Sequence, residues 1–179
     1  PVLCGAVVNF TVNSSDNCGV VSDSLTANSG DFFPVGTTTV TYSATDSSGN
    51  TSTCSFDITV NDTTSPVAVC PAPFTVSNDS GQCGATVNYT GLSASDNCGV
   101  DTTFASPASG SFFGLGTTTV VFTALDSSGN MDTCQFSVTV IDDEDPVAIC
   151  PANITVSNDS GACGAVVTFT LSGTDNCGI

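Results

Sequence analysis

Cysteine, aspartate and asparagine are the side chains of this 179-residue sequence whose types and spacing could do chemistry. The sequence has ten Cys and 17 acidic residues but no Lys, Arg or His, so its formal net charge at pH 7 is -17. Without His, the commonest general base, the catalytic triads and the imidazole metal sites are absent. Without Lys or Arg, no side chain can neutralise phosphate, which excludes nucleic acids, nucleotides and anionic membrane surfaces as partners. We therefore expect a protein that is not an enzyme, and no apolar run is long enough for membrane insertion.

The cysteines recur in a fixed order about every 80 residues, and this period divides the sequence into repeats. With no CxxC pair and no His, disulfides inside each repeat, formed in an oxidising extracellular environment, are favoured over a zinc site. The words DNCG, GTTTV and DSSGN recur with the cysteines. The ten positions are Cys4, Cys18, Cys54, Cys70, Cys83, Cys98, Cys134, Cys150, Cys163 and Cys177.

The period predicts three stretches of tandem repeat. They are a first repeat that lacks its first strand at 1–63, a complete repeat at 64–143, and the opening part of a third repeat at 144–179. In the complete repeat, apolar and polar residues alternate with the period of two that is typical of strands. The fold class is therefore all-β, with tandem immunoglobulin-like antiparallel β-sandwiches of about 80 residues that are stapled by disulfides. Strands are expected near 67–77, 83–90, 99–105, 111–114, 117–126 and 131–141.

The disulfide connectivity of the complete repeat stays open at this point, because its four cysteines allow three pairings. The first and last predicted strands run parallel from the same end of such sandwiches, which favours Cys70 with Cys134 and leaves Cys83 for Cys98. A simple layout nevertheless puts Cys83 at the far end of its strand from Cys98. The two arguments conflict.

Carboxylates gather at the predicted borders between repeats. In an immunoglobulin-like sandwich, two of the turns lie at the end that meets the preceding domain, and here those turns carry Asp and Asn. Oxygen-rich side chains that converge at such a junction suit Ca²⁺, although no cofactor is required for the fold. The alternative is that Asp and Asn only make turns and keep the surface solvated. The candidate ligands are Asp62, Asp96, Asp126, Asn130, Asp142, Asp143, Glu144, Asp145 and Asp175.

Asparagine offers a second kind of surface chemistry, since N-x-S/T words are acceptors for N-linked glycans. We expect all eight such Asn to lie in turns, in linkers or on outward strand faces, where a glycan would not disturb the core. The alternative is that a surface rich in Ser and Thr generates these words without modification. The candidates are Asn9, Asn13, Asn50, Asn61, Asn78, Asn88, Asn153 and Asn158.

Taken together, the recurring words resemble the hyalin repeat, or HYR domain, of extracellular adhesion and matrix proteins and of bacterial surface proteins. The resemblance covers essentially the whole sequence. It implies an immunoglobulin-like fold and a structural or adhesive role, and it brings no catalytic residues. The matching words are CP at Cys70 and Cys150, CGA at Cys83 and Cys163, DNCG three times, and the segments Phe32–Val60 and Phe112–Val140.

Two function classes remain. The leading hypothesis is a structural extracellular repeat protein that forms a rod or fibre, such as a surface filament, stalk or matrix strand, coated with glycans and stiffened by cations. Its partners would be copies of itself, end to end along the fibre, and glycans. The alternative is an adhesin segment that binds a carbohydrate or protein ligand through its loops. The near-identical turn words of successive repeats favour the structural hypothesis.

Overall fold

The computed structural model describes residues 3–178, and it confirms the predicted all-β, immunoglobulin-like class over that range. The chain forms two compact units. Unit 1 comprises residues 3–69, Ser93–Phe104 and Thr123–Cys134, and unit 2 comprises Cys70–Leu92, Ala105–Phe122 and residues 135–178. Within the described range, no helix has the length and hydropathy that crossing a bilayer takes.

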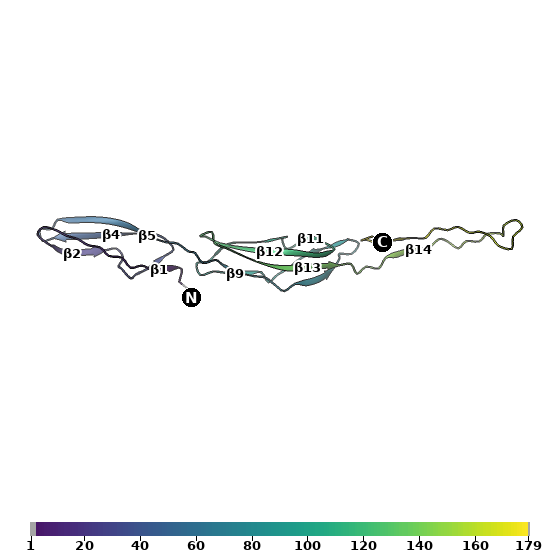
Figure 1. The fold of residues 1–179 in the computed structure, drawn as a ribbon, viewed down its shortest axis with the longest axis horizontal. Coiled ribbons are helices and arrows are strands. Elements are labelled where there is room, and N and C mark those ends of the chain that lie inside the picture. Colours follow the sequence, from purple (N-terminus) through teal and green to yellow (C-terminus); the bar gives the residue numbers. More distant parts are fainter. Residues whose placement is uncertain (1–2, 179) are drawn as a thin grey trace. The chain divides into compact units, whose positions relative to one another are not determined.

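Unit 1 is built mainly from a three-stranded antiparallel sheet with strand order β2-β4-β5. Strands β4 and β5 pair over their whole length and can be followed side by side in Figure 1. Two short antiparallel pairs, β1 with β3 and β6 with β9, also belong to this unit. The strands are β1 (Gly5–Val7), β2 (Val20–Leu25), β3 (Phe32–Pro34), β4 (Gly36–Asp46), β5 (Thr51–Val60), β6 (Val67–Val69) and β9 (Ser93–Ser95).

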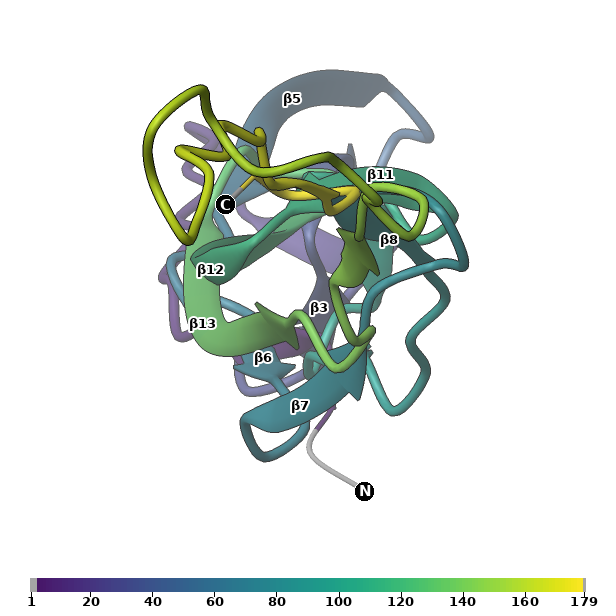
Figure 2. The same ribbon diagram turned by 90° about the vertical axis from the view of Figure 1, so that its right-hand side faces the viewer.

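Unit 2 contains an antiparallel pair of β8 and β11, which lie next to each other in Figure 2. A parallel pair joins β7 to the end of β13, as expected for the first and last strands of such a sandwich. The remaining pair in the unit is β14 with β15. The strands are β7 (Phe74–Ser77), β8 (Gly84–Val87), β11 (Ser111–Gly114), β14 (Val147–Ile149) and β15 (Ser172–Thr174).

Three long strands of the middle repeat contribute residues to both units. They belong to a four-stranded sheet with strand order β10-β12-β13-β7. The period-two pattern of the sequence is visible along β12, where Val120, Phe122 and Ala124 are buried while Val121 is exposed. The strands are β10 (Val100–Ser106), β12 (Gly116–Asp126) and β13 (Met131–Ile141).

The predicted first strand near 67–77 is broken into β6 and β7. Pro71 and Pro73 stand in the break, and proline has no N–H to donate to a strand ladder. Strand β9 was not predicted, because Ser93–Ser95 offers one apolar side chain between two serines. The other predicted strands of the complete repeat are present within a few residues of their expected ends.

Each unit has its own apolar core. In unit 2 the core includes Phe113, Val120 and Phe136, and in unit 1 it includes Phe33 and Val40. The two Phe-Phe words each place one ring in a core, because Phe33 and Phe113 are both 2 % exposed while the preceding phenylalanines are exposed. Packing in these cores fixes the strands in place. The turns that connect the strands carry the polar residues of the candidate site.

Candidate functional site

The DNCG word forms the same turn wherever it occurs. In unit 1, Asp96 Oδ1 accepts the backbone N–H of Cys98 at 2.7 Å, an Asx turn that closes the loop between β9 and β10. The equivalent bond joins Asp175 to Cys177 at 2.8 Å in unit 2. A short side chain two residues before the cysteine thus fixes the position of its sulfur.

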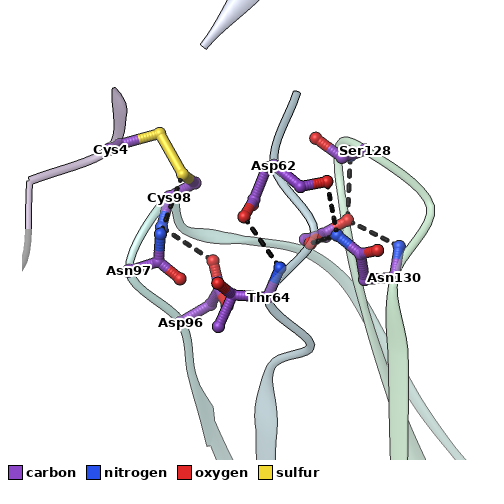
Figure 3. Close-up of a disulfide and its surroundings, with 9 residues drawn as sticks. Cys4, Asp62, Thr64, Asp96, Asn97, Cys98, Ser128 and Asn130 are labelled. Atoms are coloured by element: carbon purple, nitrogen blue, oxygen red, sulfur yellow. Dashed lines mark hydrogen bonds between the residues drawn. A yellow bond between two sulfur atoms is a disulfide. The ribbon is translucent and has the colours of Figure 1, made fainter. Parts of the chain in front are cut away.

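In unit 1 this turn is covalently joined to the preceding repeat. Cys98 is disulfide-bonded to Cys4 across a sequence separation of 94 residues, with the two Cα atoms 4.7 Å apart (Figure 3). The predicted Cys83–Cys98 pair and the restriction of disulfides to single repeats are therefore wrong. The physical reason is that the turn faces the linker before β6, beside Asp62, and so meets a cysteine of the preceding repeat.

The second predicted pair remains a prediction. Cys70 and Cys134 are each disulfide-bonded, which agrees with their proposed pairing to each other. Within residues 3–178, the six cysteines without a disulfide are Cys18, Cys54, Cys83, Cys150, Cys163 and Cys177.

A buried cluster of oxygen atoms lies beside the Cys4–Cys98 bond (Figure 3). Asp62, in the linker between β5 and β6, is only 9 % exposed. Its Oδ1 accepts the N–H of Thr64 at 3.1 Å, but its Oδ2 has no hydrogen-bond partner in the described part of the chain. The same holds for Asp96 Oδ2 and Asn97 Oδ1, which are also buried.

The carboxylates of Asp62 and Asp96 are close enough to share one ligand. A carboxylate oxygen of Asp62, a carboxylate oxygen of Asp96 and the sulfur of Cys98 all lie within 4.8 Å of one another. Buried carboxylate oxygens without a donor cost free energy, and this sequence has no Lys, Arg or His to compensate them. Since the sulfur is held in a disulfide, it offers no thiolate, and the donor set consists of oxygens.

Two other predicted ligands, Asp126 and Asn130, are hydrogen-bonded to each other within one turn. Asp126 Oδ1 accepts the backbone N–H groups of Ser128 and Asn130 at 2.8 Å, and its Oδ2 accepts the Asn130 side-chain amide at 2.7 Å. Burial by itself would raise the pKa of Asp126, but the hydrogen bonds from Asn130, Ser128 and Gly129 outweigh it and lower this pKa below its usual value. The Asn130 amide also donates to the backbone carbonyl of Asp62 at 3.1 Å, so this turn supports the linker.

Unit 2 brings the equivalent residues together, but its Asp142 is exposed where Asp62 is buried. Ligand atoms of Asp142, Asp175 and Cys177 all lie within 4.8 Å of one another. Partial burial, a hydrogen bond with the Cys83 side chain and the neighbouring Asp142 carboxylate raise the pKa of Cys177 to about 12. Cys177 is therefore a neutral thiol at physiological pH.

Two of the three remaining linker acids contact the β7–β8 turn instead of the cluster. Asp143 Oδ2 accepts the Ser77 hydroxyl at 2.6 Å. Glu144 accepts the Ser80 hydroxyl at 3.0 Å and the Gly81 N–H at 2.9 Å. Asp145 is exposed. Of the nine predicted ligands, the structure thus brings two together in unit 1 and two in unit 2.

Seven of the eight candidate glycosylation sites are exposed, as expected. The exception is Asn78, which is 9 % exposed, so the expectation that all eight face outward is wrong. Its Nδ2 donates to the carbonyl of Gln82 at 2.9 Å and to Glu144 at 3.2 Å, and its Oδ1 accepts the N–H of Asp143 at 3.3 Å. No local signal distinguishes it, because the same VSNDSG word surrounds the exposed Asn158.

Asn97 is the residue of the cluster that sequence reasoning missed. Its place between Asp96 and Cys98 in a word that occurs three times was the available signal. Its buried Oδ1 would add a third oxygen to the two carboxylates.

Comparison with known proteins gives a consistent result. The HYR domain model matches residues 4–60 and 61–140. Hyalin of Strongylocentrotus purpuratus is 40 % identical over 177 residues, covering 93 % of this chain and 15 % of that protein. Hyalin of Lytechinus variegatus is 38 % identical over 180 residues, covering 96 % and 34 % respectively.

The name of a third relative lists several kinds of domain. The sushi, von Willebrand factor type A, EGF and pentraxin domain-containing protein 1 of Rattus norvegicus is 35 % identical over 125 residues, covering 68 % of this chain and 3 % of that protein. The chain thus spans at most 34 % of the length of these curated relatives. Since the family model matches well over half of the chain, the chain belongs to the HYR domain family.

Proposed function

We propose that this chain is a segment of an extracellular structural repeat protein, a rod or fibre whose successive HYR repeats are joined at junctions that bind Ca²⁺. The observation that carries this proposal is the cluster of three buried, unpartnered oxygens of Asp62, Asp96 and Asn97. The cluster combines the linker before the second repeat with a turn of that repeat. A bound cation would tie the two segments together.

The charge of the chain supports a cation over other ligands. The 17 acidic side chains have no cationic partner in the sequence. Carboxylate and amide oxygens are the ligands that Ca²⁺ prefers, with backbone carbonyls and water completing its shell. Because Asp142 and Asp175 reproduce the pair in unit 2, the arrangement belongs to the repeat and not to one position.

The structural role rests on covalent and sequence features. A disulfide that joins residues 94 positions apart fits an oxidising, extracellular environment. Tandem repeats that each contact their neighbours build length, and ordered junctions keep such arrays extended. The hyalin relatives favour the same class of role. The partners would be further copies along the fibre and glycans on the exposed Asn.

Cation binding is tested by titrating Ca²⁺ into the metal-free protein by calorimetry, and by thermal unfolding with Ca²⁺ and with EGTA. We expect saturable binding and a higher unfolding temperature with Ca²⁺. The double variant Asp62→Asn, Asp96→Asn should abolish the unit 1 site and leave one binding event. Asp101→Asn is the matched control, because Asp101 is exposed and, among residues 3–178, its carboxylate accepts a hydrogen bond only from the neighbouring Thr102.

The rod is tested separately by small-angle X-ray scattering of the same 179-residue protein. With Ca²⁺ we expect the scattering of an extended, stiff particle, and with EGTA that of a flexible one. Binding without any change in scattering would leave a calcium site but remove its role as a stiffener. No binding at millimolar Ca²⁺ would overturn the junction proposal.

A further inference from the structure

Two cysteines of unit 2 repeat the spacing of the disulfide in unit 1. Cys4 and Cys98 are bonded across 94 residues, and Cys83 and Cys177 differ by the same number of positions. Cys83 stands in the CGA word that also contains Cys4, and Cys177 stands in the DNCG word that also contains Cys98. Among the six cysteines without a disulfide, all within residues 3–178, no other pair has this spacing.

The structure also brings these two side chains together. The Cys83 side chain lies close enough to raise the pKa of the Cys177 thiol, and the sulfur of Cys177 lies 4.0 Å from the carbonyl oxygen of Gln82, the residue before Cys83. Asn176 Nδ2 donates to the carbonyl of Gln82 at 3.0 Å, which ties the turn of Cys177 to the residue before Cys83. The turn itself is built as in unit 1, with Asp175 accepting the N–H of Cys177.

The sulfur environments of the two turns match as well. In unit 1 the Asn97 side-chain amide lies 3.2 Å from the sulfur of Cys98. In unit 2 the Asn176 amide lies 3.3 Å from the sulfur of Cys177. The two turns thus hold their sulfurs in the same way. The sulfur of Cys98 is bonded to Cys4, and the sulfur of Cys177 lies near the Cys83 thiol.

We propose that Cys83 and Cys177 form a disulfide, so that each CGA cysteine bonds the DNCG cysteine of the next repeat. The oxidant is a low-molecular-weight disulfide such as oxidised glutathione. A protein thiolate attacks it and releases one small thiol, and the second protein thiolate then displaces the other. One S–S bond breaks and one forms, and the two thiol protons leave on the two small thiols.

A metal bound by the Cys177 thiolate together with Asp142 and Asp175 is the competing interpretation. The equivalent sulfur of Cys98 is already held in a disulfide beside the equivalent carboxylates, which favours a disulfide in unit 2. A hard cation needs only the oxygens, so the disulfide and the proposed calcium site are compatible. The inference goes beyond the proposed function and holds whether or not a cation binds.

Disulfide mapping tests the proposal on the 179-residue protein equilibrated in a glutathione redox buffer. The protein is acid-quenched, unfolded, alkylated without reduction, digested with pepsin and analysed by mass spectrometry. We expect a linked peptide containing Cys83 and Cys177 beside the Cys4–Cys98 peptide, with both unit 2 thiols protected from alkylation. Alkylation of both Cys83 and Cys177 in protein that retains Cys4–Cys98 would overturn the proposal.

Two variants and a chelator sharpen this test. Cys177→Ser should convert Cys83 from protected to fully alkylated. Cys163→Ser is the matched control, because Cys163 stands in the same CGA word without a cysteine at the required spacing, and it should leave Cys83 protected. The linked peptide should persist after EDTA treatment. Protection of Cys83 that survives in Cys177→Ser, or that EDTA removes, would contradict the disulfide.

Discussion

At the scale of single residues, Asn78 shows how one side chain connects a turn to a linker. It accepts the N–H of Asp143 and donates to Gln82 and Glu144. A glycan on its Nδ2 would replace one of the two amide hydrogens that donate these bonds and would require a buried atom to become exposed. Asn78 is thus a structural residue in spite of its acceptor word.

Replacing Asn78 with Ala should therefore destabilise unit 2. Loss of the buried amide leaves the Asp143 N–H and the Gln82 carbonyl without their partner, at a cost of about 1–3 kcal/mol. The measurement is denaturant unfolding followed by hydrogen exchange of β8 and β13. Asn158→Ala is the control, since Asn158 has the same neighbours in sequence but is exposed, and an equal loss in both variants would contradict the assignment.

Gly84 is a second residue with a defined task. A Cβ at this position would meet the ring of Phe112 and the carbonyl oxygen of Phe113, which belong to the paired strand. The glycine of the CGA word thus lets an aromatic ring lie across the strand. The burial of Gly84 agrees with this close approach.

We predict that Gly84→Ala lowers the free energy of unfolding by about 1–3 kcal/mol, because the added methyl group overpacks this contact. Gly114 is the cross-strand partner of Gly84, and a Cβ there would meet nothing within 4 Å. Gly114→Ala is therefore a control in the same strand pair and should be nearly neutral. Equal effects of the two variants, measured by thermal unfolding, would show that the ring contact is not the cause.

At the scale of elements, the same turn behaves differently in two surroundings. The DSSGN turn after β4 holds Asp46, and the one after β12 holds Asp126. Both carboxylates accept hydrogen bonds from their own turn, and these bonds lower the pKa of each. Of the two, Asp126 is buried and Asp46 only partly so, because the linker with Asp62 contacts the turn of Asp126 through Asn130.

Acid should therefore weaken the turn after β12. A carboxyl whose pKa is lower in the folded than in the unfolded state stabilises the fold above the usual Asp pKa, about 3.9, and loses this contribution as pH falls through its folded pKa. We expect Asp126→Asn to unfold more easily than wild type at pH 7, and the two to converge between about pH 4 and 2. A difference that stays constant with pH in acid unfolding curves would contradict this prediction.

The sequence predicted the strands well where apolar and polar residues alternate, as along β12 and β13. It could not predict β9, because its pairing with β6 depends on backbone groups and not on a side-chain pattern. Within the site, Asp62 and Asp96 were predicted as ligands from their place at a border. The disulfide partner of Cys98 was not, since a bond across 94 residues is decided by how repeats meet and not by any local word.

At the scale of the whole chain, the spacing of the disulfides exceeds the period of the repeat. Cys4–Cys98 spans 94 residues, whereas the sequence repeats about every 80 residues. With Cys83–Cys177 also formed, the two spans overlap by about 15 residues. The shortest covalent path along the chain then crosses from Cys4 to Cys98, follows the chain back to Cys83, and crosses to Cys177. Most residues of each repeat lie in the loops that these bonds close, outside this path.

This covalent path predicts how the chain responds to force. Fully reduced, the 179 residues can extend to about 600 Å. With Cys4–Cys98 as the sole disulfide, the maximum extension falls to about 300 Å. With both overlapping bonds, only the segment between Cys83 and Cys98 and the two chain ends can stretch, about 20 residues in all, which gives about 70 Å. Single-molecule pulling through the two termini, with and without reductant, measures these lengths. A value near 300 Å in the oxidised protein would show that the second bond is absent, whereas a value near 70 Å would make an HYR array an almost inextensible tether even after its sandwiches unfold.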